Sequence, residues 1–328
     1  MVSLPERLSL PLRRKHLFLT NSKKVLKTYF SQHRGEWKGP LMAITAAVFY
    51  GFIPAFTLPI HGSDSGNAEA MSNPSILFYR FFGAAVMLGF YMLLKRRSFR
   101  ITRGEAVTLI YLAFLSDGAA LFLLAGYSYM PTGIATTIHF TYPVVTAVIM
   151  MMFYNEARRP ATIVATCMAV AGVAGLSWPS ENGAVELRGV VIELISALCF
   201  ALYLIRVNRS RVRSMDSLRL TFYVLLFGGL IFGGDALRQD SLEMVSTPRQ
   251  MINLLLLAFV CTVVTNLCLV TAVKRIGSTT AAVLGALEPL TAVVLGSLLF
   301  SEVITLNIVI GIILIIPSVI IVILTRGR

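Results

Sequence analysis

The chain of 328 residues is 56% hydrophobic and only 14% charged, with a mean hydropathy of +0.76 and a formal net charge of +13. Soluble domains carry about 25% charged residues, so this composition excludes a water-soluble globular protein of this length. The four cysteines lie in apolar stretches and form no CxxC pair, which excludes a disulfide framework and argues against a zinc site.

The N-terminal segment, residues 1–39, is polar and basic and lacks the apolar core of a secretory signal peptide. Within it Val25, Leu26, Tyr29 and Phe30 share one helix face with lysines around them. That pattern is typical of a short helix on an anionic membrane surface, and a disordered tail fits the composition equally well. We therefore predict a basic cytoplasmic tail over these residues.

Ten apolar stretches follow the tail, each close to the about 20 residues that a helix needs to cross the hydrocarbon layer. They are residues 40–60, 74–94, 105–128, 132–153, 160–178, 189–206, 217–236, 251–273, 278–300 and 304–325. Membrane helices tolerate proline where neighbouring groups satisfy the freed backbone atoms. Beyond the first residue of each stretch, the prolines are Pro54, Pro59, Pro143, Pro289 and Pro317. The sequence predicts an all-α membrane protein with ten transmembrane helices.

The basic residues between these stretches indicate how the chain is oriented. If the N-terminus is cytoplasmic, all of the 29 Lys and Arg residues except Arg80, Arg188, Arg238 and Arg249 fall in cytoplasmic segments. This bias follows the positive-inside rule, and it accounts for the net charge without a nucleic-acid partner. We predict a multi-pass protein with both termini in the cytoplasm, and the short loops favour a bacterial inner membrane.

The chain also matches itself at a nearly constant offset. Because five helices per half is an odd number, the second half must enter the membrane from the opposite side. Inverted repeats of this kind are typical of transporters that bind solute near the midplane, although chance similarity between apolar helices is an alternative explanation. The aligned pairs are Pro143 with Pro289, Glu156 with Glu302 and, less clearly, Gly39 with Gly189.

Taken together, these features resemble the EamA-type drug/metabolite transporter superfamily. The resemblance rests on ten helices in two halves, on a proline midway in helices 4 and 9, and on a glutamate that ends each of these helices. Tyr50-Gly51 stands where that family often has Trp-Gly, and Arg80 lies near the start of helix 2 as it often does there. Gly311 also fits the pattern, whereas Ala165 replaces the corresponding residue in the first half.

The resemblance covers about residues 40–325 and implies two EamA-like repeats, over 40–178 and 189–325. It also implies alternating access to a central cavity lined largely by helices 1, 3, 4, 6, 8 and 9, with no cofactor. Tyr50 on helix 1 is then expected to contact the solute.

Three ionisable groups lie deep in the apolar stretches, where a charge costs about 2.5–3.5 kcal/mol and so faces a cavity or a partner. Asp117, His139 and Glu288 are therefore candidates both for substrate binding and for proton coupling. Each also has a structural interpretation as a hydrogen bond between helices. For Glu288 this is a protonated carboxyl that bonds a carbonyl freed by Pro289.

Tyr142 and Asn266 complete the candidate substrate-binding set. Tyr142 adjoins Pro143 and aligns with Glu288, while Asn266 can bond either a solute or another helix. Arg80 lies about 9 Å along its helix by helical rise, and we interpret it as an anchor that snorkels outward or pairs with an acid. The predicted structural anchors are Arg80, Pro143, Pro289, Glu156 and Glu302.

No signature of an enzyme or of an ATP-driven motor is present: the sequence lacks HExxH, GxSxG, GxxxxGK[ST] and any metal-ligand cluster. We therefore predict a secondary transporter of a small organic solute, with no metal and no cofactor. Few cationic groups lie in the apolar stretches, which disfavours multiply anionic solutes. An amino acid, a nucleobase or an amphipathic solute fits better, with proton coupling and uncoupled transport both open. The alternatives are an intramembrane enzyme and a regulatory membrane protein without transport.

Overall fold

The computed structural model describes residues 34–57, 59–60, 71–126, 128–130, 132–157, 159–177, 186–300 and 305–325. The described residues form helices joined by short connections, and no β-strand occurs among them. The helices are α2 (Arg34–Tyr50), α3 (Ile53–Thr57), α4 (Asn73–Leu94), α5 (Arg103–Gly126), α6 (Thr132–His139), α7 (Tyr142–Phe153), α8 (Pro160–Ser177), α9 (Leu187–Arg209), α10 (Ser217–Arg238), α11 (Pro248–Ala258), α12 (Thr265–Ile276), α13 (Ser278–Leu284), α14 (Leu287–Phe300) and α15 (Leu306–Thr325). Two short turns complete the set, the 3-10 turn η2 (Arg211–Ser214) and the π-helical turn η3 (Phe259–Val264).

The ten predicted helices are present in the described part of the chain. Nine stretches are long and apolar enough to cross a membrane, and α8 adds a shorter apolar one, Pro160–Gly175. We number them spans 1 to 10 in chain order: α2–α3, α4, α5, α6–α7, α8, α9, α10, α11–η3–α12, α13–α14 and α15. The predicted all-α membrane fold of ten helices is therefore confirmed.

The predicted tail is only partly within the described residues. Residues 1–33, including the amphipathic segment around Tyr29, lie outside them. The helix α2 begins at Arg34, and the apolar stretch that can cross the membrane begins within it at Trp37, a few residues before the expected start near residue 40. Gly39 packs directly on Ile276 of α12, so this turn is part of the bundle.

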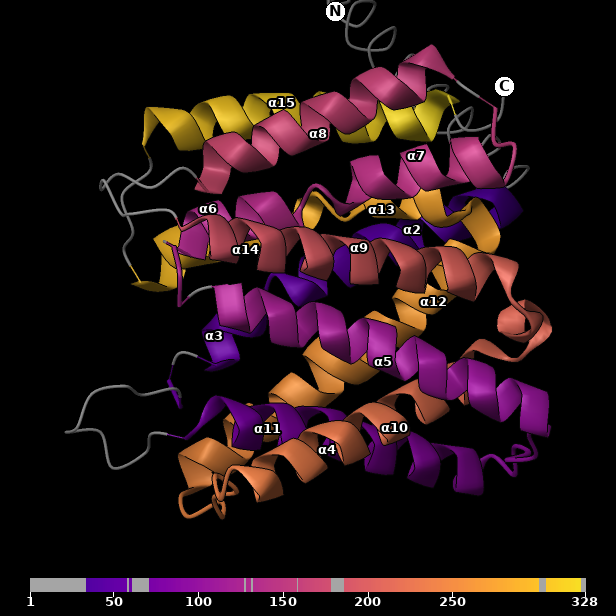
Figure 1. The fold of residues 1–328 in the computed structure, drawn as a ribbon, viewed down its shortest axis with the longest axis vertical. Helices are drawn as coiled ribbons and strands as arrows, with labels where there is room; N and C mark the ends of the chain where they lie inside the picture. The colour runs from indigo at the N-terminus through magenta and orange to yellow at the C-terminus, as the bar shows by residue number, and fades with distance from the viewer. Residues whose placement is uncertain are drawn as a thin grey trace, which may run out of the picture.

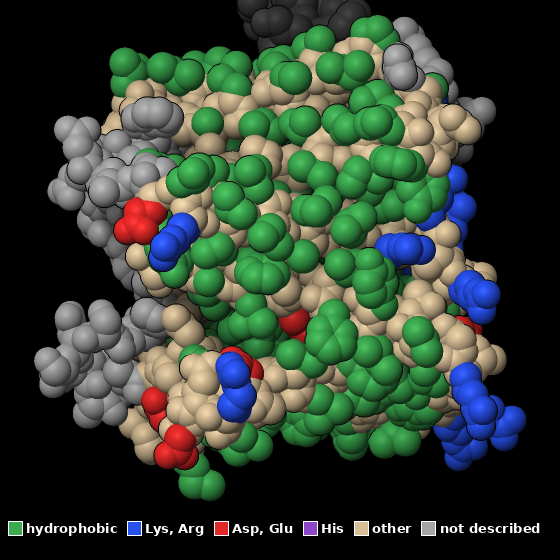
Figure 2. Space-filling model, in the orientation of Figure 1, with side chains coloured by type: hydrophobic (Ala, Val, Ile, Leu, Met, Phe, Trp, Pro, Cys, Tyr) green, Lys and Arg blue, Asp and Glu red, His purple; other side chains and the backbone are tan. Residues whose placement is uncertain are grey.

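The outside of the bundle suits a lipid environment. Large apolar side chains such as Phe90, Phe114 and Leu298 are more than half exposed. Figure 2 shows hydrophobic side chains across the middle of one face, with Lys and Arg gathered along its right-hand edge. The segments at this basic end include the end of α4, the start of α5 and the end of α9 (Figure 1).

Helix packing follows the predicted inverted repeat. In such a repeat each span of the first half corresponds to the span five places later in the second half. The α5–α9 contact then corresponds to the α12–α2 contact. The α4–α10 and α8–α15 contacts each correspond to themselves. Single residues follow the same rule. Gly39 packs on Ile276, and its repeat partner Gly189 packs on Met130 in the corresponding place. The weaker alignment of Gly39 with Gly189 is thus a true structural equivalence.

Two tyrosines join α4 and α10 at opposite ends of the bundle. Tyr79 Oη of α4 donates a 2.9 Å hydrogen bond to the carbonyl of Glu243, in the loop after α10. Tyr223 Oη of α10 donates a 2.6 Å bond to the carbonyl of Phe99, in the loop after α4. The offset along the chain from Tyr79 to Tyr223 is the same as the offset from Phe99 to Glu243. The two contacts are therefore repeat equivalents on opposite membrane faces.

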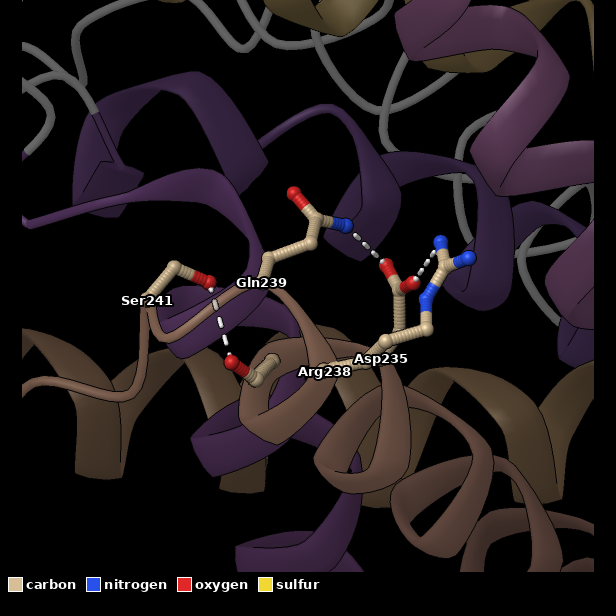
Figure 3. Close-up of polar contacts among 5 residues, drawn as sticks. Asp235, Arg238, Gln239 and Ser241 are labelled. Atoms are coloured by element: carbon tan, nitrogen blue, oxygen red, sulfur yellow. Dashed lines mark hydrogen bonds and ion pairs between the residues drawn. The ribbon is translucent and has the colours of Figure 1, made fainter.

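The loop after α10 is further tied down by local polar contacts. Figure 3 shows Asp235 bound to Arg238 at 3.0 Å and accepting a 2.7 Å bond from Gln239 Nε2, while Ser241 Oγ donates to the Ala236 carbonyl. The Ser241 carbonyl in turn accepts a 2.6 Å bond from Ser75 Oγ of α4. With both ends fastened, α4 and α10 form one rigid pair.

Replacing Tyr79 or Tyr223 by Phe is expected to destabilise the protein by about 0.5–1.5 kcal/mol each, because each change removes one hydrogen bond. The two sites lie at opposite ends, so the double variant is expected to show the sum of the two losses. Unfolding in detergent measures these values, with Tyr91→Phe, an exposed tyrosine of the same helix, as the control. A loss with Tyr91→Phe equal to that with Tyr79→Phe would contradict the role of the bond.

Spans 4 and 9 are each broken at their middle. α6 and α7 are separated at Phe140–Thr141, and α13 and α14 at Gly285–Ala286. Pro143 and Pro289 follow these breaks, because proline lacks the N–H that a continuous helix would use there. The continuous ranges 132–153 and 278–300 expected for these spans are therefore two helices each.

Candidate functional site

The breaks in spans 4 and 9 face each other in the centre of the molecule. Tyr142, the first residue of α7, donates a 3.4 Å hydrogen bond from Oη to the carbonyl of Ala282 in α13. A Cβ on Gly285 would collide with this same hydroxyl group. Gly285 is the repeat partner of His139, so the two halves place a glycine and a histidine at equivalent breaks.

A chain of hydrogen bonds connects spans 1, 8 and 2 beside this crossing. Tyr50 Oη, at the end of α2, donates to Asn266 Oδ1 at 3.2 Å. Asn266 Nδ2 donates to the carbonyl of Thr262 at 3.0 Å, and Thr262 Oγ1 accepts a 2.9 Å bond from Arg80 Nε. The site therefore includes Arg80, which the sequence had indicated only as an anchor.

The π-helical turn makes this arrangement possible. The hydroxyl groups of Thr262 in η3 and of Thr265, the first residue of α12, donate to the carbonyls of Leu257 and Val260, five residues earlier in each case. A wider turn of this kind inserts one residue into the helix and frees backbone carbonyls, a feature often found at functional sites. No proline or glycine marks it in the sequence.

Arg80 and Glu288 are the opposite charges of this centre. The Glu288 backbone lies against Gly51, next to Tyr50. The hydrogen-bond chain from Tyr50 leads to Arg80. No ion pair within 4.0 Å links Arg80 to Glu288. Apart from the bond to Thr262, neither charged group makes a hydrogen bond to any described residue. Both groups therefore retain donors or acceptors for a third partner.

The side chains of Arg80, Glu288 and Tyr50 are only partly buried. Each remains partly accessible to water, unlike the neighbouring Tyr142 and Asn266. An accessible arginine and glutamate, contributed within the spans by the two different halves, have the position expected of a solute site.

His139 is held in place by a hydrogen-bond relay. Ser196 Oγ of α9 donates a 2.6 Å bond to the carbonyl of Ala119 in α5 and lies 2.8 Å from His139 Nδ1. Since the Ser196 hydroxyl has only one proton to give, His139 Nδ1 must donate in this contact. The imidazole thus ties α6 to α9, and its ring lies 5.7 Å from that of Tyr142.

Asp117 lies apart from the central chain. Its carboxylate is buried in α5 against Gly228 of α10, where a Cβ would come within 2.8 Å of Oδ1. Neither oxygen has a hydrogen-bond partner among the described residues. The electrostatic influence of Asp117 extends to Tyr203 of α9, which is also influenced by Tyr50.

Glu193 is a functional candidate that the sequence did not single out. It lies in the second turn of α9, and its side chain is fully buried against Gly126 of α5. Its two carboxylate oxygens have no hydrogen-bond partner within the described ranges. Its position in the apolar stretch VVIELISAL was the available signal, obscured because α9 begins earlier than predicted.

The predicted anchors occupy different environments. Pro143 and Pro289 begin the second halves of the broken spans. Glu156 accepts a 2.7 Å bond from Thr279 Oγ1, which connects the end of span 4 to the start of span 9. Glu302 lies outside the described residues. No group of three or more potential metal ligands occurs in the described part of the chain.

Comparisons with known proteins fit this architecture. The EamA-like transporter family matches residues 37–178 and again residues 187–324, once in each half. The chain is 26% identical over 197 residues to the "Uncharacterized transporter YvbV" of Bacillus subtilis (strain 168), an alignment that spans 59% of this chain and 64% of that relative. A solved structure described as "Crystal structure of protein" shares the fold, with a TM-score of 0.72 and 15% identity over 88% of this chain and 99% of that one.

The two family matches together cover most of the chain, and they fall on the two halves that helix packing relates to each other. The chain is a multi-pass integral membrane protein that belongs to the EamA-like transporter family.

Proposed function

We propose that this protein is a secondary transporter that carries a small zwitterionic solute, such as an amino acid, by alternating access to the central site. The observation that carries the proposal is the pair Arg80 and Glu288, two groups of opposite charge at the central site that form no ion pair with each other. A solute with a carboxylate and an ammonium group offers the complement to both. A nucleobase-like or amphipathic solute would instead use the lining of Tyr50, Tyr142 and Asn266.

The charges also argue against other classes of solute. Placing an arginine and a glutamate inside the membrane is costly unless each meets a partner of opposite charge. A multiply anionic solute would meet one cation, Arg80, with the repulsion of Glu288 beside it. A zwitterion, in contrast, satisfies both groups at once.

Glu288 is our preferred proton-coupling group. The Nδ1 atom of His139 is engaged with Ser196, and Asp117 faces Gly228 rather than the central chain. The Glu288 side chain is partly accessible to water and makes no hydrogen bond to a described residue. A proton that binds Glu288 when the ammonium group leaves would replace the positive charge beside the carboxylate and neutralise Glu288 itself during the return step.

Transport by purified protein in proteoliposomes tests the proposal. With a panel of labelled amino acids, the wild-type protein is expected to accumulate its solute when a pH gradient is imposed. Glu288→Gln is expected to lose that response, because the neutral amide cannot exchange a proton. Asp235→Asn, at the exposed ion pair of Figure 3, is the control and should behave like the wild type.

The outcomes separate coupling from transport itself. If wild-type flux ignores the gradient, coupling through Glu288 fails and uncoupled transport remains. If no zwitterionic solute is carried under any condition, the proposed substrate class fails.

We further propose that the basic end of the bundle faces the cytoplasm of a bacterial inner membrane. The end of α4, the start of α5 and the end of α9 carry Lys and Arg at this end, as the positive-inside rule requires. In the variant Arg97→Cys the new thiol should then react with a membrane-impermeant reagent only from the inside. In the variant Asp240→Cys it should react only from the outside. The reverse pattern would overturn the orientation.

A further inference from the structure

A cavity lies away from the central site, at the basic end of the bundle. It has a volume of about 420 Å³ and opens to the surface between α5 and the end of α9. Its walls are Val107, Thr108 and Tyr111 of α5 together with Arg206, Arg209, Ser210 and Arg211. Nothing in the proposed transport cycle uses this cavity.

The cavity concentrates three positive charges that lack an anion. Arg206 lies over the ring of Tyr111, with 5.6 Å from Cζ to the ring centroid. Within the described chain, none of Arg206, Arg209 and Arg211 has an acidic group within 4.0 Å. Ser210 Oγ in the same wall is buried and has no hydrogen-bond partner among the described residues. Three guanidinium groups and an unused hydroxyl form the donor set that a phosphate group requires.

The surface that continues from the cavity toward the middle of the membrane is apolar. On α5, Val107, Tyr111 and Phe114 are spaced along one helix face and are exposed. On α9, Leu198 and Val191 continue the face of Arg206 and are also exposed. Figure 2 shows this combination along the basic edge, with Lys and Arg side chains beside hydrophobic surface. A free phosphate ion would use only the arginines, whereas a lipid would use both parts.

We propose that this cavity binds an anionic phospholipid, with the phosphate held by Arg206, Arg209 and Arg211 and the acyl chains lying along α5 and α9. Basic pockets between transmembrane helices are suited to such headgroups, since each basic residue near them adds to the affinity. Bound there, the lipid joins α5 to α9, the contact that pairs spans 3 and 6.

Native mass spectrometry of the full chain tests this directly. In neutral detergent, the protein is titrated with phosphatidylglycerol, with phosphatidylcholine and with soluble glycerol phosphate. The wild-type protein is expected to bind one phosphatidylglycerol in preference to phosphatidylcholine. The triple variant Arg206→Gln, Arg209→Gln, Arg211→Gln should bind it about ten- to a hundredfold more weakly.

Two further variants make the result specific. Replacing Arg96, Arg97 and Arg100 by Gln removes the same charge from the same end and should change affinity less than about threefold. Single Arg209→Gln, which is milder than the triple change, should weaken binding about fivefold. Equal losses in both triple variants, or no preference over phosphatidylcholine, would overturn the proposal. Glycerol phosphate that displaces the lipid at comparable concentration would show that the site binds free phosphate.

Discussion

Arg80→Gln is expected to abolish transport of a zwitterionic solute and to weaken its binding by more than about thirtyfold. The substitution removes the bond from Nε to Thr262 Oγ1 and the positive charge that faces the solute carboxylate. Truncating one partner of a buried charged pair typically costs about 2–5 kcal/mol, and 1.4 kcal/mol is a tenfold change in affinity. Solute-dependent thermal stabilisation and uptake into proteoliposomes measure the two effects.

The matched variants distinguish charge from geometry. Arg80→Lys keeps the charge but loses the planar fork, so partial activity is expected. Arg238→Gln removes an equally charged group from the exposed ion pair with Asp235 and should change neither value. Transport by Arg80→Gln at the wild-type rate would show that Arg80 is only an anchor.

Gly51→Ala is expected to destabilise the protein by about 1–3 kcal/mol and to stop transport. Gly51 lies where span 1 breaks between α2 and α3. An added Cβ would come within 2.8 Å of the Glu288 carbonyl oxygen and 2.5 Å of Thr291 Cβ. Because backbone atoms cannot rotate away, span 1 must move off α14, which separates Tyr50 on span 1 from the Glu288 carboxylate on α14.

Gly234→Ala is the control for this change. It adds the same methyl group within α10, where nothing lies within 4 Å of the new atom. We expect it to be neutral or to stabilise the protein by up to about 1 kcal/mol, since alanine favours the helix. Unfolding in detergent and solute uptake compare the two variants. A Gly51→Ala protein as stable and as active as Gly234→Ala would mean that spans 1 and 9 do not pack closely at the site.

The overall fold was predictable from the sequence because the bilayer imposes one strong constraint on every span. Each crossing needs about 20 apolar residues, so the ten spans and the inverted halves follow from length, hydropathy and one internal match. The breaks in spans 4 and 9 were not predicted, although Pro143 and Pro289 lie just after them and proline cannot continue the backbone ladder. Pro317, however, lies inside the unbroken α15, so proline alone does not predict a break.

The composition of the site was less predictable, because hydropathy gives the depth of a residue but not the direction it faces. Arg80 could be placed along span 2, but its bond to Thr262 depends on the π-helical turn in span 8. For the same reason Asp117 was grouped with Glu288, whereas it faces Gly228 of α10. Such directions are set by tertiary packing between helices that are far apart in sequence.

The central claim is that Arg80 and Glu288 together hold the two ends of one solute between the repeats. Its most direct test is a binding cycle with three ligands: an amino acid, its amide without the carboxylate, and its deaminated acid without the ammonium group. The wild-type protein should prefer the amino acid. Arg80→Gln should no longer prefer the amino acid over the amide, but should still prefer it over the deaminated acid. Glu288→Gln should no longer prefer the amino acid over the deaminated acid, but should still prefer it over the amide. If both variants weaken all three ligands equally, the two residues do not read opposite ends of a solute, and the account is wrong.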